Sequence, residues 1–127
     1  MKKECNIDII TRAGSGEAFK TKSRGSYYLK RGKSYVIFKT EGDRCRIEFD
    51  EKELLYKRLG ELNYALVLAS GEKTETDMIS SVGRSHIECL TKSYSAEIKK
   101  DVININIGYN IAGEELGMEI TITGEFL

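Results

Sequence analysis

The stretch VININIGYNI, residues 102–111, alternates strictly between apolar and polar side chains. A period of two is that of a β-strand with one dry and one wet face, as in antiparallel sheets. The stretch therefore predicts an antiparallel strand beside a hydrophobic core. The residues on its dry face are Ile103, Ile105, Ile107, Tyr109 and Ile111.

The same alternation recurs earlier in the chain, in CNIDIIT (5–11) and RCRIEFD (44–50). Glycine-containing segments between such stretches predict hairpin turns. These segments are KRGK (30–33), EGDR (41–44), SG (70–71) and AGEE (112–115). Strands at this spacing are typical of sandwiches and barrels. We expect an all-β chain of about eight to ten strands, forming one domain over residues 1–127.

The composition excludes several classes of protein. Lys+Arg and Asp+Glu are equal at 20 each, which argues against a dedicated nucleic-acid binder. No apolar run approaches the roughly 18 residues that span a bilayer, so we expect no membrane partner. Three widely spaced cysteines predict neither a disulfide framework nor a zinc site, and indicate a reducing cytoplasm. No cofactor motif is present, and a homodimer is left open.

The segment DEKELLYKRLGEL, residues 50–62, fits two structures. Asp50 and Glu53 form a capping-box pattern, and leucines four and three residues apart form a helical face. On that interpretation Arg58 is a surface residue of a helix. On the strand interpretation Arg58 shares one face with Leu54 and Tyr56. Lys57 lies on the opposite face, so each face carries a cation. The local pattern slightly favours the helix.

Five segments follow one another along the chain: GSYYLKRGKSYVIFKTE, RCRIEF, LYKRLGELNYALVLASGEK, VININIGYNI and LGMEITI. This order resembles the YwiB-like family, which consists of bacterial proteins with a calycin-type, lipocalin-like β-barrel. The most specific shared piece is an arginine and a glycine two residues apart, here Arg58 and Gly60. The resemblance implies that 53–59 is a strand, which overrides the helical pattern. The segment TDMISSVGRS, residues 76–85, departs from the family because a threonine-proline-tyrosine-glycine turn is absent there.

Arg58 is the residue on which the site prediction depends. A guanidinium inside a barrel is costly unless a carboxylate pairs with it. Glu41 shares the parity of Tyr35, so we expect both to point inward and Glu41 to pair with Arg58. The pair either fixes strand register or receives an anionic group of a small ligand. The residues predicted to line a ligand site are Arg58, Glu41, Tyr35 and Tyr56.

The inward-facing residues are mostly Ile, Leu, Phe and Met, which favours a filled barrel over an open cavity. Four tyrosines on apolar parities add polar groups, as ligand cavities often do. They are Tyr35, Tyr56, Tyr64 and Tyr109.

Residues 18–40 contain seven basic residues and no acidic one. Basic residues interleaved with aromatic ones can bind single-stranded nucleic acid. The favoured interpretation is a solvated strand face with a charged sheet edge, which protects against edge pairing. The residues of the alternative surface are Lys20, Lys22, Arg24, Tyr27, Tyr28, Lys30, Arg31 and Lys33.

The remaining polar residues do not form a catalytic set. His86, the single histidine, shares parity with Arg84 and Glu88 and is expected to face water, so neither a metal site nor a catalytic triad is predicted. We expect a non-enzymatic barrel that binds a small, anionic molecule near its interior or mouth. The alternatives are a protein- or RNA-interaction module that uses residues 20–33, and a filled barrel without a ligand.

Overall fold

The computed structural model describes residues 2–113 and 117–127, and the regular structure in this part of the chain is all β. No helix there is long and apolar enough to cross a membrane. The strands are β1 (Lys2–Ala13), β2 (Ala18–Lys30), β3 (Lys33–Thr40), β4 (Asp43–Phe49), β5 (Glu53–Leu59), β6 (Leu62–Ala69), β7 (Lys73–Ser80), β8 (Gly83–Lys99), β9 (Val102–Ile111) and β10 (Met118–Phe126).

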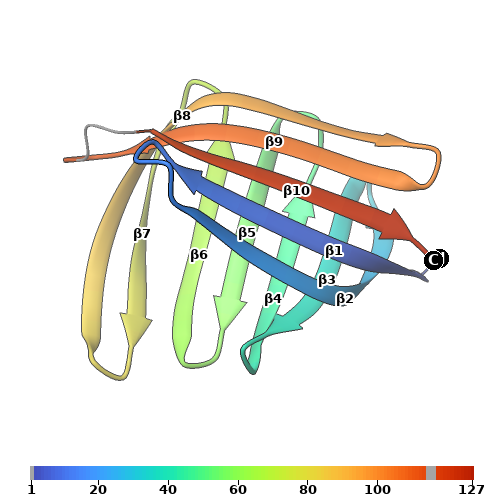
Figure 1. Ribbon diagram of the computed structural model, residues 1–127, viewed down its shortest axis with the longest axis horizontal. Helices are drawn as coiled ribbons and strands as arrows, with labels where there is room; N and C mark the ends of the chain where they lie inside the picture. Colours follow the sequence, from blue (N-terminus) through green and yellow to red (C-terminus); the bar gives the residue numbers. More distant parts are fainter. Residues whose placement is uncertain (1, 114–116) are drawn as a thin grey trace.

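Neighbouring strands are antiparallel, and their order follows the sequence around a closed barrel. β1 pairs with β2 on one side and with β10 on the other, which closes the sheet. β4 to β7 run across the direction of β1, β9 and β10, so two walls cross over the interior (Figure 1). The prediction of an all-β antiparallel barrel of eight to ten strands is confirmed.

The hairpin turns form where glycine predicted them. Arg31–Gly32 and Glu41–Gly42 are two-residue turns in which both residues have positive φ, at 52° and 80° and at 52° and 85°. Such turns match the right-handed twist of the flanking strands. Gly71 also has positive φ, at 79°, between β6 and β7. The fourth predicted turn, AGEE, includes Glu114 and Glu115, which lie outside the described residues.

Residues 53–59 form strand β5, as the family resemblance implied and the local pattern did not. β5 pairs with β4 through Cys45 and Arg58, and with β6 on its other side. The capping-box pattern has a different role here. The Asp50 carboxylate accepts hydrogen bonds from the backbone N–H of Lys52 at 2.8 Å and of Glu53 at 3.0 Å, which closes the turn that leads into the strand.

One half of the interior is tightly filled. The predicted dry faces of β1, β4 and β9 are buried, and the cysteines pack among them without a disulfide. Burial raises the pKa of each thiol, which disfavours the reactive thiolate form. This filled half is formed by Cys5, Ile7, Val36, Phe38, Cys45, Ile47, Phe49, Ile103 and Ile105.

The junction between β6 and β7 is the weakest in the barrel. Only Leu62 and Asn63 of β6 are paired with β7, at Ser80 and Ile79. Every other junction carries at least six registered pairs among the described residues. Near the other end of this junction, the Thr74 hydroxyl donates to the Val67 carbonyl at 2.6 Å. The strands β6 and β7 are therefore held together mainly at their ends.

Candidate functional site

The half of the barrel between β5 and β9 is hollow. A cavity of about 270 Å³ opens there, next to the filled half. The prediction of a filled interior is therefore wrong at this end of the barrel. The side chains that line this end come from β1, β2 and β5 to β10, and they leave a space between them. The apolar residues of the cavity wall are Ile9, Leu54, Leu66, Leu68, Met78, Ile87, Cys89, Ile107, Ile111, Ile120 and Ile122.

Tyrosines give the cavity a polar section. Tyr56, Tyr64 and Tyr109 line it, as three of the four tyrosines on apolar parity were expected to do. The rings of Tyr56 and Tyr64 are stacked, with centroids 5.8 Å apart. Burial raises the pKa of Tyr109 to about 12 and raises the pKa of Tyr56 and Tyr64 as well. The three hydroxyls therefore stay protonated at neutral pH and can donate hydrogen bonds to a ligand.

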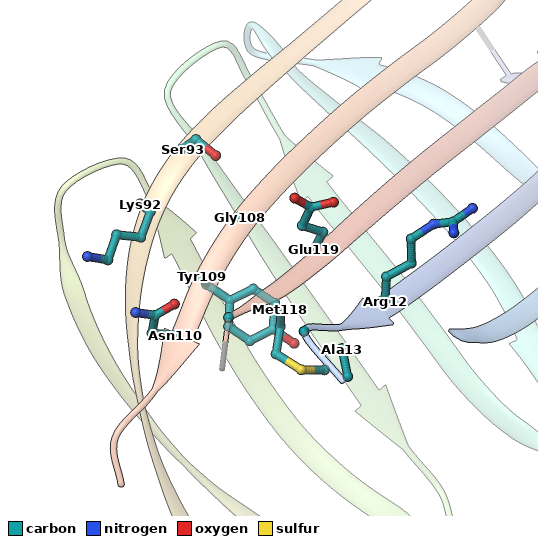
Figure 2. Close-up of a pocket in the computed structure, with 11 residues that line it drawn as sticks. Arg12, Ala13, Lys92, Ser93, Gly108, Tyr109, Asn110, Met118 and Glu119 are labelled. Atoms are coloured by element: carbon teal, nitrogen blue, oxygen red, sulfur yellow. The ribbon is translucent and has the colours of Figure 1, made fainter. Parts of the chain in front are cut away.

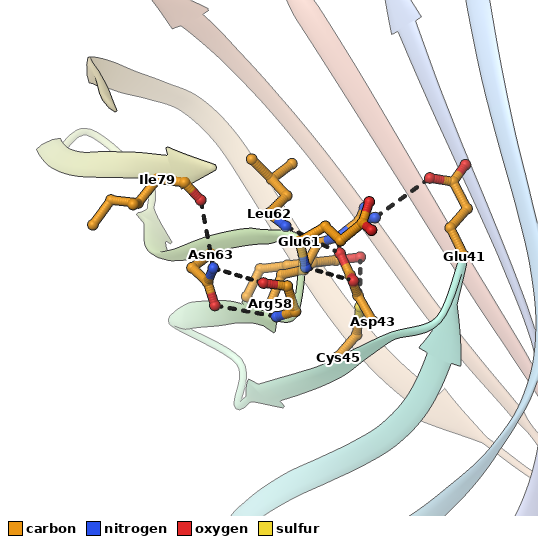
Figure 3. Close-up of polar contacts among 10 residues, drawn as sticks. Glu41, Asp43, Cys45, Arg58, Glu61, Leu62, Asn63 and Ile79 are labelled. Carbon is orange, nitrogen blue, oxygen red and sulfur yellow. Dashed lines mark hydrogen bonds and ion pairs between the residues drawn. The ribbon is translucent and has the colours of Figure 1, made fainter. Parts of the chain in front are cut away.

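Arg58 lines the same cavity and its side chain is 17% exposed, so the inward direction predicted for it is confirmed. Its nearest carboxylate is Asp43, which is 4% exposed. Arg58 Nε donates to Asp43 Oδ2 at 2.8 Å, and Asp43 also accepts from the backbone N–H of Glu61 at 2.9 Å (Figure 3). The Arg58 hydrogen bond, then the Glu61 N–H, lower the pKa of Asp43. Asp43 is thus an ionised carboxylate that anchors the arginine and the β5–β6 turn together.

Glu41 is a second and weaker partner of Arg58. The predicted ion pair is present, with Arg58 Nη2 and Glu41 Oε2 3.4 Å apart, but the Glu41 side chain is 82% exposed. Glu41 does not point inward as predicted, because it lies in the turn with a φ of 52° rather than in β3. It therefore approaches Arg58 from the solvent side (Figure 3).

Tyr35 does not line the cavity. The buried residues of β3 are Ser34, Val36 and Phe38, so the parity assigned to Tyr35 was wrong by one residue. Its ring lies on the outer surface, stacked on Tyr28 at 4.9 Å with 4° between the planes. Of the four predicted ligand-site residues, only Arg58 and Tyr56 line the cavity.

Asp43 was not predicted as a site residue, and the sequence did not explain why position 60 is a glycine. A Cβ atom on Gly60 would lie 2.0 Å from Asp43 Oδ1, so only glycine fits beside this carboxylate. In the arginine-x-glycine pattern, Arg58 and Gly60 therefore both lie against the same residue, Asp43. The alternation in β4 could have placed Asp43 in the interior, because Asp43 lies two residues before Cys45 and so shares its inward face.

The two tyrosines of the predicted basic surface (residues 20–33) face opposite ways: Tyr28 outward and Tyr27 inward. Tyr27 packs against the core and shares a hydrogen bond of 3.0 Å with Ser34, so its assignment to a basic surface is wrong. The charged-edge explanation is wrong as well, since β2 is paired on both sides in the closed barrel. Arg31 lies in a turn. The other residues of the predicted surface are on the outward face of β2 or at the start of β3, namely Lys20, Lys22, Arg24, Tyr28, Lys30 and Lys33.

His86 lies on the outer face of β8, as its parity indicated, with a 52% exposed side chain. Its Nδ1 is 2.8 Å from Asp77 Oδ1, and this contact raises the pKa of His86. Glu75 and Glu88 flank its Nε2 at 3.6 and 3.8 Å. Within the described chain, Glu75, His86 and Glu88 are the groups that could hold a metal ion. Two of the three residues are exposed and Glu88 is half-buried, so the cluster is also an ordinary surface arrangement.

A second hollow, of about 510 Å³, lies on the outside over β8, β9 and β10. Figure 2 shows Arg12, Lys92 and Glu119 around it with their charged ends apart. Gly108 forms part of its floor, where a Cβ atom would lie 2.7 Å from the Ser93 hydroxyl. This hollow is open to solvent and has few apolar side chains, so the interior cavity is the better candidate for a binding site.

These features define a small closed β-barrel with a half-empty interior and an anchored arginine beside the cavity. A family model described as "Domain of unknown function (DUF1934)" matches residues 6–121, and the chain belongs to this family.

Two relatives support the YwiB-like resemblance. The "Uncharacterized beta-barrel protein YwiB" of Bacillus subtilis (strain 168) is 26% identical over 112 residues, which are 84% of this chain and 79% of the relative. The "Crystal structure of ywiB protein from Bacillus subtilis" matches with a TM-score of 0.90 and 21% identity, over 99% of this chain and 93% of that one. The structural match shows that the barrel fold is shared.

Proposed function

We propose that the protein is a non-enzymatic binding module that takes a small, mainly apolar molecule with one anionic group into the barrel, as in lipocalin-like proteins. The observation that carries this proposal is the cavity of about 270 Å³ beside Arg58. Small-molecule sites are typically apolar hollows of roughly 300–1,000 Å³ with few polar groups. At about 270 Å³ the cavity lies just below that range, which favours a small ligand. Three unpaired cysteines support a cytoplasmic location.

Arg58 supplies the polar end of this site. Asp43 accepts a hydrogen bond from the Nε of Arg58, and Glu41 accepts one from its Nη2. The two carboxylates therefore hold the guanidinium plane at the cavity. Burial lowers the pKa of Arg58 but its bond to Asp43 raises it, and the pKa is raised on balance, so the group stays charged. A ligand carboxylate can displace the exposed Glu41 at Nη2 while Asp43 keeps its place. The tyrosine hydroxyls offer further donors.

Displacement of an uncharged fluorescent probe, 6-propionyl-2-(dimethylamino)naphthalene, tests the proposal. Octanoate and its methyl ester are compared as competitors, because they share an apolar chain and differ in charge. We expect octanoate to compete more strongly with the wild type, and Arg58→Met to remove that advantage. Lys57→Met is the matched control, since it removes the neighbouring cation from the outer face of β5. Equal competition by both compounds, or no probe binding, contradicts the anionic site.

A cavity-filling variant tests the location of the ligand. Leu66 lines the cavity, whereas Ala65 next to it is exposed on the outer face. Leu66→Phe is expected to reduce probe binding because the added ring occupies the hollow, and Ala65→Phe is expected to leave binding unchanged. A probe that binds both variants equally is bound outside the barrel.

A further inference from the structure

We propose that the outer surface of β2 to β5 binds single-stranded RNA. This outer basic face is formed by Arg24, Lys39, Arg44, Arg46 and Lys57, with Tyr28 and Tyr35 beside it. The proposal is independent of the interior cavity, because the side chains involved point away from it. It differs from the basic segment considered from the sequence, since three of its five cations come from β4 and β5.

Cations of the outer basic face lie directly opposite one another on neighbouring strands. Lys39 is opposite Arg44 across β3 and β4, and Arg46 is opposite Lys57 across β4 and β5. Like charges in directly opposite positions destabilise a sheet. Since the barrel is closed, edge protection does not explain them. A polyanionic partner would remove the repulsion.

Carboxylates neutralise this face only in part. Glu48 lies 3.6 Å from Arg46, and Glu4 lies 3.9 Å from Arg24. Within residues 2–113 and 117–127, no carboxylate lies within 4.0 Å of the amine of Lys39 or Lys57 or of the Arg44 guanidinium. The Arg46 Nε is buried and has no hydrogen-bond partner. The cationic groups available to phosphates on this face are therefore chiefly those of Lys39, Arg44 and Lys57.

Apolar and aromatic surfaces lie among these cations. A hollow of about 180 Å³ has Ile37 and Leu59 in its wall together with Arg44, Arg46 and Lys57. Ile37 and Leu59 are 41% and 49% exposed. Further along β3, the stacked rings of Tyr28 and Tyr35 form a flat aromatic surface. Such a combination suits unpaired bases, which stack on apolar and aromatic groups while their phosphates contact Lys and Arg.

The shape of the surface favours a single strand over a duplex. Reading a duplex groove requires a protruding helix or β-ribbon, whereas this face is the wall of a barrel. An acidic peptide or an anionic membrane would also meet the cations, but neither needs the tyrosine stack. These partners are therefore separate outcomes of the test.

Fluorescence anisotropy with a labelled oligouridylate of about a dozen nucleotides tests the proposal. We expect binding at about 50 mM salt that weakens steeply towards about 200 mM. The triple variant Lys39→Gln, Arg44→Gln and Lys57→Gln is expected to weaken binding about tenfold or more and to lower the salt slope by about 2, at about 0.7 per lost phosphate contact. The matched control is Lys73→Gln, Lys99→Gln and Lys100→Gln, which removes three exposed cations outside this face.

The role of the bases is tested by Tyr35→Leu and by an abasic oligonucleotide of the same length. Both changes are expected to weaken binding about tenfold, because stacking contributes roughly 1–3 kcal/mol per base. Thermal unfolding checks that the variants fold, and the triple variant is expected to melt higher than the wild type because like charges are removed. Equal binding of the abasic chain, of polyglutamate or of phosphatidylserine vesicles overturns the RNA proposal, as does equal binding by the triple variant and its control.

Discussion

The Arg58 guanidinium and the Asp43 carboxylate lie 2.8 Å apart at the end of the cavity, on neighbouring strands β5 and β4. Asp43 is almost fully buried and its remaining bonds go to the backbone of the β5–β6 turn. The pair therefore connects three elements: the cavity wall, strand β4 and the turn at Gly60. Any ligand that reaches Arg58 meets a group already fixed in direction, which lowers the entropic cost of binding.

Asp43→Asn is expected to lower the thermal midpoint more than Glu41→Gln does, because Asp43 is the buried partner of Arg58 and Glu41 is exposed. The effect depends on pH. The folded pKa of Asp43 is below its ordinary value of 3.8, so its contribution to stability is present above pH 3.8 and is lost as the pH falls through the folded pKa. Thermal melts should therefore show the difference between wild type and Asp43→Asn at pH 7 and a smaller one in strongly acidic solution. A constant difference at all pH values would contradict the ion pair.

Gly60→Ala is expected to lower the free energy of unfolding by about 1–3 kcal/mol, the range for inserting a methyl group into an occupied space. The added Cβ would lie 2.0 Å from Asp43 Oδ1, so the carboxylate must move and its bond to Arg58 must lengthen. Chemical denaturation measures the loss. The matched control is Gly16→Ala, since a Cβ there meets nothing within 4 Å while the backbone φ of 98° is also unfavourable for alanine. If both variants lose equal stability, backbone strain and not the contact with Asp43 is the cause.

Local patterns predicted most strands but failed at Tyr35, Glu41 and Asp43. The two-residue period located β1, β4 and β9 because each has one wet and one dry face. It misassigned Tyr35, since Ser34 is buried and Ile37 is exposed in β3, so hydrophobicity there does not report direction. Asp43 escaped attention because a buried carboxylate contradicts the rule that charged residues are outside. The cavity itself depends on how two walls cross, which no local pattern encodes.

His86 should titrate above its ordinary pKa of 6.5, because the Asp77 carboxylate stabilises the imidazolium. The contribution of this pair to stability is fully present below pH 6.5 and is lost as the pH rises through the folded pKa. NMR titration of the single histidine measures the value directly. Asp77→Asn is expected to bring the pKa back towards 6.5, while Glu97→Gln, also on β8 but absent from the contacts of His86, is expected to leave it unchanged. An unshifted pKa in the wild type would show that Asp77 and His86 do not pair in solution.

The sparse pairing between β6 and β7 predicts that the barrel opens at this junction. Leu66 and Met78 line the cavity from these two strands, so separation of β6 from β7 would expose the cavity to solvent. Local opening is favoured where few hydrogen bonds must break. Hydrogen–deuterium exchange is therefore expected to be faster in peptides from residues 62–80 than in peptides from β9, whose residues pair on both sides. A ligand in the cavity should slow exchange in residues 62–80 more than in β9, which also lines the cavity but is already paired on both sides. Equal protection of both regions would place the route into the cavity elsewhere in the barrel.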